Sequence, residues 1–87
     1  MAHHKDAIKR IKQNAKARAR NRHFRTRMRN QILRVRAAVD AGKGEEASAE
    51  FKEAVSIIHH VVSKGVIHRN QAARKISRLN KAVKALA

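Results

Sequence analysis

The feature that most constrains this chain of 87 residues is the run from Lys5 to Arg36, which contains thirteen Lys or Arg residues, one acidic residue and neither Gly nor Pro. A segment without these backbone breakers can be helical from end to end. At 1.5 Å rise per residue, a helix of some thirty residues would be about 50 Å long. Because so dense a positive charge repels itself, the run needs an extended polyanion beside it, and RNA is the leading candidate.

Composition limits the kind of protein that this chain can be. It contains two Phe, two Met and no Trp or Tyr, which suffices for one thin core between helices but not for the deep, dry pocket of most enzymes. We therefore expect no enzymatic activity and no cofactor. The chain has no Cys for a disulfide or a thiolate zinc site, and its net charge of +16 points to nucleic acid or an anionic membrane surface.

The N-terminal sequence does not have the pattern of a membrane or secretory segment. No stretch has the length and apolar character of a membrane-spanning helix, and the positive N-terminus lacks the apolar region of a signal peptide. Organellar transit peptides can also start in this basic way. Because the basic pattern continues into the expected fold, we interpret it as mature protein. A membrane-surface helix would need a bulky apolar face that this segment lacks.

Charge divides the chain into three parts, with net charges of +12, −3 and +7 in residues 1–36, 37–63 and 64–87. Near the boundaries lie the three glycines, Gly42, Gly44 and Gly65. Gly is favoured just past a helix C-terminus because it adopts the left-handed conformation without steric cost. We therefore expect helices to end at both boundaries.

Each part carries apolar residues at the 3.6-residue period of an amphipathic helix. The first stripe is Phe24, Met28, Ile32, Val35 and Val39. The second is Ala47, Phe51, Ala54, Val55, Ile58, Val61 and Val62. The third is Ala73, Ile76, Leu79, Val83 and Leu86. The sequence therefore predicts an all-α fold, a three-helix bundle with helices at about 5–40, 45–63 and 68–85.

The first expected helix is nearly twice as long as the others, and its apolar stripe begins only at Phe24. We expect a single domain, 1–87, in which residues 24–87 form the three-helix core and residues 1–23 project beyond it as a basic arm. Like charges recur four residues apart along this arm, and each such pair destabilises an isolated helix by about 0.2–0.5 kcal/mol. We predict that the arm frays or is disordered in the free protein and becomes ordered on a polyanion.

The cations of the first helix cannot all lie on one helical face, which favours insertion between RNA segments with phosphates on several sides. Lys and Arg would neutralise phosphates, while Gln and Asn would reach sugar hydroxyls or base edges. The residues expected to bind RNA here are Lys5, Lys9, Arg10, Lys12, Gln13, Lys16, Arg18, Arg20, Asn21, Arg22, Arg25, Arg27 and Arg29. The plainer alternative is a solvated basic tail that binds any polyanion.

The third expected helix has a second basic face, opposite its apolar stripe, and carries no acidic residue. An ordinary solvated helix surface is the plainer alternative, but such surfaces mix charges of both signs. We expect a second RNA contact at this helix and its start, made by His68, Arg69, Asn70, Arg74, Lys75, Arg78 and Lys81.

Two other groups of polar residues do not predict chemistry of their own. One consists of Glu46, Glu50 and Glu53. Because no base or pocket accompanies them, we expect them to turn away from RNA or to pair with basic neighbours on adjacent helices. The histidines include the adjacent His59 and His60, with no residue nearby to complete a ligand set, and His3 and His4 at the chain end. We therefore expect no metal site.

Residues 64–79 read KGVIHRNQAARKISRL. This segment resembles a hallmark of the bacterial small-subunit ribosomal protein family conventionally numbered twenty. In that family a Lys-Gly-aliphatic-Ile-His turn leads into a helix with Asn, Ala-Ala-Arg and Ser-Arg-Leu at these spacings. The likeness extends over essentially the whole chain, including the Asp40-Ala41-Gly42 turn. In the first expected helix it involves Ala7, Lys9, Arg10, Gln13, Asn21, Arg25, Met28 and Arg29.

The resemblance implies a structural constituent of the small ribosomal subunit that binds small-subunit ribosomal RNA directly and bridges RNA segments during assembly. The implied RNA contacts are the 5′ domain and the long penultimate helix, alongside other components of the subunit. It implies no enzyme activity. Because the sequence has neither a bulky apolar face for a membrane nor an obvious dimer seam, we expect no membrane partner and no homo-oligomer, and we expect a location in the ribosome of the cytoplasm or of an organelle. The main alternative is a nucleoid-type architectural DNA-binding protein, which would usually dimerise or insert an apolar wedge into the minor groove.

Overall fold

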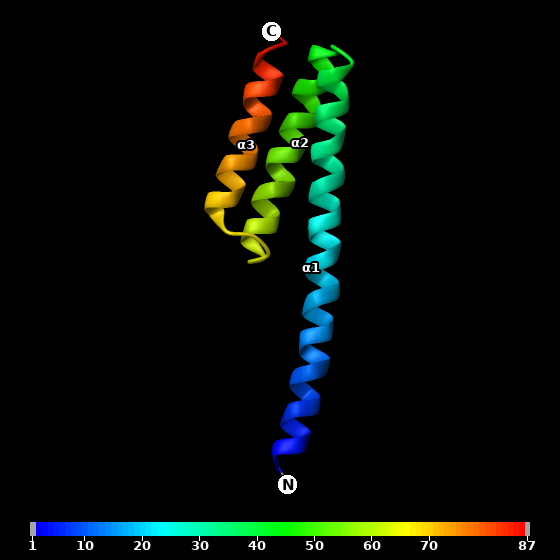
Figure 1. The fold of residues 1–87 in the computed structure, drawn as a ribbon, viewed down its shortest axis with the longest axis vertical. Helices are drawn as coiled ribbons and strands as arrows, with labels where there is room; N and C mark the ends of the chain where they lie inside the picture. The colour runs from blue at the N-terminus through cyan, green and yellow to red at the C-terminus, as the bar shows by residue number, and fades with distance from the viewer. Residues whose placement is uncertain (1, 87) are drawn as a thin grey trace.

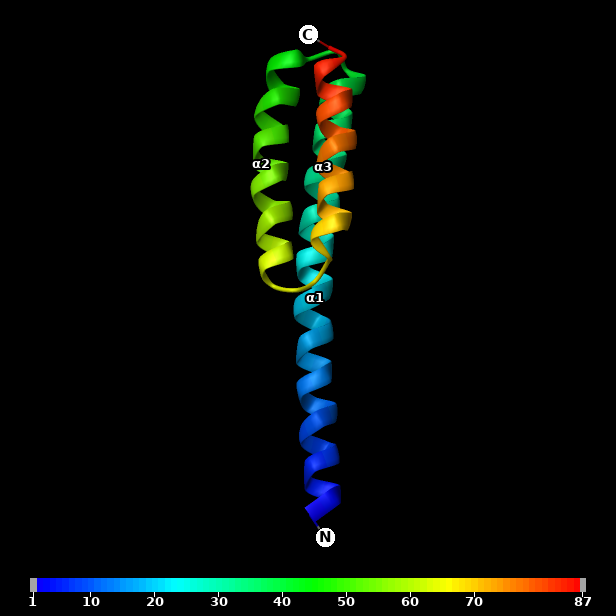
Figure 2. The same cartoon turned by 90° about the vertical axis from the view of Figure 1, so that its left-hand side faces the viewer.

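A computed structural model of the chain describes the main chain of residues 2–86 and the side chains of residues 5–86. The described range contains three helices, α1 (Ala2–Asp40), α2 (Gly44–Ser63) and α3 (Arg69–Lys84), and no strand. Figures 1 and 2 show α2 and α3 packed along the C-terminal half of α1, while the N-terminal half of α1 extends beyond them. The prediction of an all-α three-helix bundle with a projecting first helix is confirmed.

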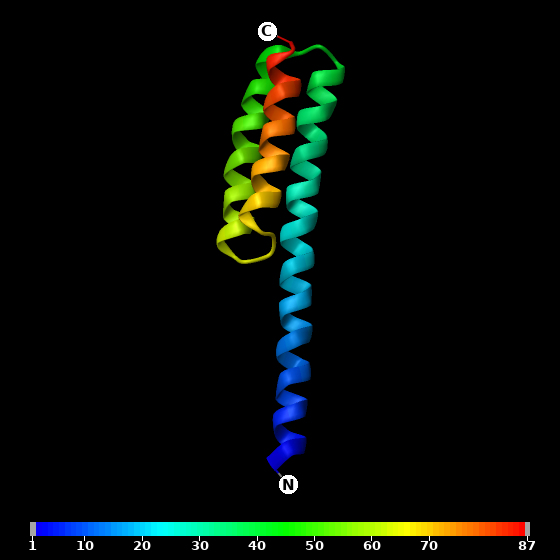
Figure 3. The same ribbon diagram turned by 60° about the vertical axis from the view of Figure 1, so that its left-hand side comes forward.

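The molecule is a rod rather than a sphere. Its Cα atoms extend over 65 × 21 × 14 Å. The 39 residues of α1 account for about 58 Å at 1.5 Å per residue, so this helix sets nearly the whole length. Figure 3 shows both termini at opposite ends of the long axis, with the turn between α2 and α3 lying partway along α1.

The core lies where the three helices meet, and α2 contributes the largest share of its buried residues. The fully buried large side chains are Val35 from α1 and Ile58 and Val61 from α2. Complete burial of a Val or Ile side chain contributes about 1.5–3 kcal/mol. From α3 and the turn before it, the buried residues are Val66, Ala72 and Leu79.

The structure corrects the predicted stripes of α2 and α3. Ala73 was expected on the inner face of the third helix, but Ala72 is buried and Ala73 is exposed. On α2, Ile57 joins the core although the expected stripe passed it by. In both cases burial depends on the direction from which a neighbouring helix packs, and the apolar period of a single helix does not determine that direction.

Both interhelical turns have the same glycine-dependent geometry. After α1, the N–H of Gly42 donates to the Val39 carbonyl at 3.0 Å and the N–H of Lys43 donates to the Ala38 carbonyl at 3.0 Å. Gly42 has φ +71°, and this pair of bonds with a left-handed residue is the Schellman motif. The motif ends α1 sharply and sends the chain back along it as α2.

The turn after α2 repeats this pattern at Gly65, whose φ is +72°. Its N–H donates to the Val62 carbonyl at 2.9 Å, and the N–H of Val66 donates to the Val61 carbonyl at 3.2 Å. Val61 and Val66 are both buried, which supplies the apolar contact that accompanies a Schellman motif. This turn therefore helps to close the end of the core beside the arm.

Burial along α1 begins well inside the helix. Every side chain from residue 5 to residue 16 is exposed, including Ile8 at 53% and Ile11 at 67%. Phe24 is half-buried and packs against the core, and Met28 is the first buried side chain. The helix itself continues without a break to Ala2. The predicted fraying of residues 1–23 concerns the free protein in solution and stays a prediction.

Candidate nucleic-acid interface

The cations of the arm surround the helix and are accessible to solvent. Since successive helical residues are turned by about 100°, charges at these spacings are distributed around the whole circumference. The exposed cations of this segment are Lys5, Lys9, Arg10, Lys12, Lys16, Arg18, Arg20 and Arg22. A flat anionic surface would contact only some of them, so the arm suits surroundings that are anionic on several sides.

The uncharged residues predicted for the arm interface differ in accessibility. Gln13 is exposed and lies in the same shallow hollow as Lys16 and Arg20. Asn21 is half-buried, and it is the one predicted interface residue that is not fully exposed. Its amide is therefore less available than those of its exposed neighbours.

Where α1 enters the bundle, its cations separate to two sides. Arg25 and Arg29 border a groove between α1 and α3. Arg27 lies beside a hollow of about 290 Å³ that α1 shares with α2, and the carboxylate residue of this hollow is Glu53. The three arginines are all exposed, but only the pair facing α3 lines a hollow without an acidic residue among those described.

At the start of α3, His68 has a structural role in addition to the predicted one. It is the N-cap residue, with extended backbone (φ −77°, ψ 147°), and its Nδ1 accepts a hydrogen bond from the Asn70 N–H at 3.1 Å. Because Nδ1 accepts this bond, the ring proton is on Nε2 in the neutral imidazole. His68 is exposed, so the Nε2–H is left to donate to a phosphate or a ribose hydroxyl.

The predicted cations of α3 are exposed but do not all face the same way. Lys75 lines the groove against α1, whereas Arg78 lies in a separate hollow of about 340 Å³. That second hollow also contains Arg36 and Asp40 from the end of α1. The basic face of α3 therefore has one carboxylate close by, which the sequence of the third helix alone did not indicate. The other exposed members are Arg69, Arg74 and Lys81.

The glutamates of α2 do not neutralise the two basic surfaces. Within residues 5–86, the ion pair that the structure contains joins Lys43 to Glu46, with 3.9 Å between Nζ and the carboxylate, and both side chains are exposed. Glu50 instead accepts a hydrogen bond from an uncharged amide of α1, that of Gln31. The expected pairing of these acids with cations of adjacent helices is therefore not found among the described side chains.

Gln31 is the polar residue that sequence reasoning missed. It is 4% exposed, lies among the buried residues of α1, and donates its Nε2 to the Glu50 carbonyl at 3.0 Å. The sequence contains a signal for this burial, because Gln31 follows Met28 by three residues and precedes Val35 by four. This spacing places it on the apolar stripe, in the midst of a segment whose other polar residues are exposed.

Two of the histidines, His23 and His60, pack against an aromatic ring. His23 and His60 flank Phe24 edge-on, with ring centroids 5.6 and 5.5 Å from it. Across the described part of the chain, no three His, Cys, Asp or Glu side chains lie together in a way that could hold a metal ion. The side chains of His3 and His4 lie outside the described residues. Within the same part of the chain, no helix combines the length and the apolar character needed to cross a membrane.

The fold and the charge distribution define a class, namely small three-helix proteins with an overlong basic helix whose charge the rest of the chain does not neutralise. The family model described as Ribosomal protein S20 matches residues 2–84. The chain belongs to the ribosomal protein S20 family, whose members are structural components of the ribosome and not enzymes.

Individual relatives match the chain over almost its full length. A protein of Pelobacter propionicus named small ribosomal subunit protein bS20 is 52% identical over 86 residues, which is 99% of each chain. Its namesake in Desulfatibacillum aliphaticivorans is 53% identical over 87 residues, 100% of this chain and 99% of the relative. The namesake in Oleidesulfovibrio alaskensis is 54% identical over 83 residues, 95% of each. The family resemblance stated from residues 64–79 is thus confirmed.

Proposed function

We propose that this chain is a constituent of the small ribosomal subunit in the cytoplasm that binds small-subunit ribosomal RNA directly and holds separate RNA segments together during assembly. One surface consists of the exposed cations of the arm, from Lys5 to Arg22, and the other is the exposed basic side of α3. The RNA segments contacted would be the 5′ domain and the long penultimate helix, as the family resemblance implies.

The observation that carries this proposal is the separation of two basic surfaces along an elongated molecule, 65 Å in its longest dimension. The arm extends beyond the end of the bundle, while α3 runs along the other half of α1 (Figure 1). Five of the six acidic residues fall between them in sequence, at residues 40–53, and leave both surfaces positive. A single RNA helix could neutralise one of these surfaces, whereas two RNA segments are needed to neutralise both.

Electrostatics also predicts how the binding responds to salt. Each phosphate that a Lys or Arg neutralises releases a condensed counterion, so affinity falls with salt concentration. With about ten such contacts, the slope of log affinity against log salt would be about −7 to −9. The exposed cations of the arm, none of which is in an ion pair with a described acidic side chain, are alone numerous enough for most of this effect.

The test is hydroxyl-radical footprinting on small-subunit ribosomal RNA with two charge-matched variants. One replaces Lys12, Lys16 and Arg20 with Gln; the other replaces Arg74, Arg78 and Lys81 with Gln. We expect two protected RNA regions, with the arm variant losing one and the α3 variant losing the other. A single protected region would contradict bridging. Equal affinity for folded ribosomal RNA and duplex DNA at about 200 mM salt would favour the architectural DNA-binding alternative instead.

A further inference from the structure

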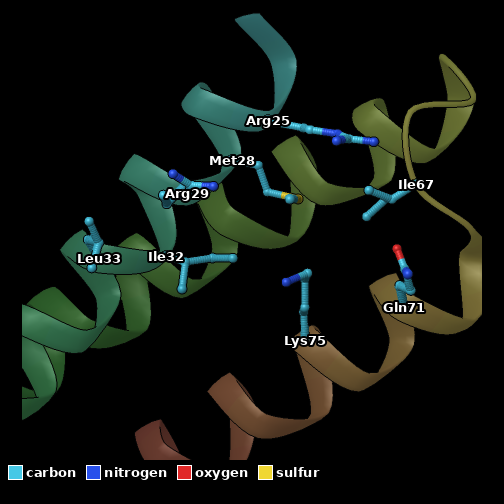
Figure 4. A pocket seen from close by; sticks show the side chains of 8 residues that line it. All are labelled: Arg25, Met28, Arg29, Ile32, Leu33, Ile67, Gln71 and Lys75. Atoms are coloured by element: carbon cyan, nitrogen blue, oxygen red, sulfur yellow. The ribbon is translucent and has the colours of Figure 1, made fainter. Parts of the chain in front are cut away.

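A groove of about 400 Å³ lies between α1 and the start of α3. Figure 4 shows Met28 and Ile32 pointing from α1 across this groove toward Ile67 and Lys75. Its remaining lining residues are Arg25, Arg29, Leu33 and Gln71. The volume falls in the range of about 300–1,000 Å³ that small-molecule binding pockets occupy.

The floor of the groove is apolar. Met28 is 7% exposed, and Ile32 and Ile67 are half-buried and packed against the core. Leu33 at the edge is 56% exposed and is one of three large apolar side chains in the described part of the chain that are more than half exposed. A flat apolar body would cover these side chains, and the polarisable thioether of Met28 suits an aromatic ring.

The rim of the groove is cationic. Arg25 and Arg29, one helical turn apart on α1, and Lys75 on α3 converge on it. The described lining includes no carboxylate, and none of the three cations is in an ion pair with a described acidic side chain. Three like charges around one hollow repel each other, so an anion that enters it is favoured.

We propose that this groove holds one unpaired nucleotide of the RNA, with its base on the apolar floor and its flanking phosphates on Arg25, Arg29 and Lys75. RNA recognition commonly uses bases that are splayed out of the helix, and guanidinium planes as well as apolar side chains stack on them. The exposed amide of Gln71 offers one acceptor and two donors, which is what reading a base edge requires. This inference rests on the proposed RNA-binding function and adds a site that recognises a base to surfaces that bind phosphate.

An acidic peptide is the other occupant that the charges would accept. The carboxylates of such a peptide would bind the cations of the rim. They would leave the amide of Gln71 and the apolar floor of the groove without a specific partner. A nucleotide uses the rim, the floor and the amide together, and the groove lies between the two surfaces assigned to RNA. These features favour the nucleotide.

The test combines base-specific and backbone probing of small-subunit ribosomal RNA bound to the full chain. Gln71→Ala and Leu33→Ala both change exposed side chains without changing charge, so both variants should fold. Ser77→Ala, on an exposed side chain of α3 outside the groove lining, is the matched control. Dimethyl sulfate reports unpaired A and C bases, a carbodiimide reports unpaired U and G bases, and hydroxyl radicals report the backbone.

We expect at least one unpaired base that wild-type protein and Ser77→Ala protect and that Gln71→Ala and Leu33→Ala leave reactive. The backbone footprint should persist in all four proteins, and each groove variant should lower RNA affinity about 3- to 10-fold, the effect of one lost contact. A normal backbone footprint without any base whose protection depends on the groove would overturn this inference alone. Absence of the backbone footprint in wild type would overturn the proposed function, and this inference with it.

Discussion

The side-chain amide of Gln31 on α1 donates to both the main-chain carbonyl of Glu50, at 3.0 Å, and the Glu50 carboxylate on α2. Among the side chains of residues 5–86, this is the one polar side chain buried among the apolar contacts of the core. We expect Gln31→Ala to lower the free energy of unfolding by about 1–3 kcal/mol, through the lost hydrogen bonds and the small cavity that remains. Thermal or urea unfolding monitored by circular dichroism would measure it.

Exchanging the residue types of Gln31 and Glu50 separates the contribution of their hydrogen bond from that of packing. Gln31→Glu places two carboxylates together and should destabilise the fold more than Gln31→Ala at neutral pH. Adding Glu50→Gln to Gln31→Glu restores an amide–carboxylate pair with the roles exchanged, so the double variant should recover part of the lost stability. If the double variant were as unstable as the sum of the single changes, the two side chains would not be coupled.

Gln31 also shows where sequence reasoning reaches its limit in this protein. The helix count, the helix ends and the projection of α1 follow from period, glycine position and length, all of which are local properties. The burial of Gln31 depends on the approach of α2, whose Glu50 it contacts, while the preference for Ala72 over Ala73 and the groove at Met28 depend on the angle at which α3 approaches α1. Both are decided by packing between distant segments, and no single helix encodes them. The predicted interface residues were easier to place, because charge alone keeps them on the surface.

Two glycines, Gly65 in the second Schellman turn and Gly44 at the start of α2, should respond differently to replacement by Ala. The φ of +72° at Gly65 is unfavourable for a residue with a Cβ, although a Cβ there would meet no atom within 4 Å. Gly65→Ala should therefore destabilise the fold by about 1–2 kcal/mol through backbone conformation alone. Gly44 also has open space around its Cβ position but no positive φ, and it begins α2. Gly44→Ala should be neutral or stabilise by up to about 1 kcal/mol. Equal effects of the two changes on the unfolding midpoint would refute this distinction.

The N-cap bond between His68 and Asn70 predicts that a shorter cap can replace the histidine in folding but not in RNA binding. His68→Ala should lower stability by about 0.5–2 kcal/mol because the Asn70 N–H loses its partner. Asn is among the preferred N-cap residues, so His68→Asn should retain the stability of the wild type. Both variants lose the Nε2–H, and both should therefore weaken RNA binding to a similar degree. Measuring unfolding and RNA affinity on the same three proteins checks this. Wild-type RNA affinity in His68→Asn would limit the histidine to its structural role.

The exposure of the cations on α3 predicts a change in the salt dependence of RNA binding. Replacing Arg74, Arg78 and Lys81 with Gln should make the log–log slope shallower by about 2–3, since each lost phosphate contact removes about 0.7–0.9. Lys52→Gln on the acidic α2 is the control, and it should leave the slope unchanged. A filter-binding series from about 50 to 200 mM salt gives the slopes. An unchanged slope in the triple variant would mean that these cations face solvent in the complex.

The positive charge of the arm should destabilise its helix in the free protein and stabilise it on RNA. The arm has no core contacts to stabilise its helix, and like-charged neighbours four residues apart, such as Lys12 with Lys16 and Lys16 with Arg20, destabilise it. We expect the free protein at about 100 mM salt to show less helix by circular dichroism than the structure contains, and to gain helix on binding RNA. Lys16→Glu converts both repulsive pairs to attractive ones, so it should raise helicity in the free protein while it lowers RNA affinity. Full helicity of the wild type without RNA would show that the arm is preformed, and Lys16→Glu would then change affinity alone.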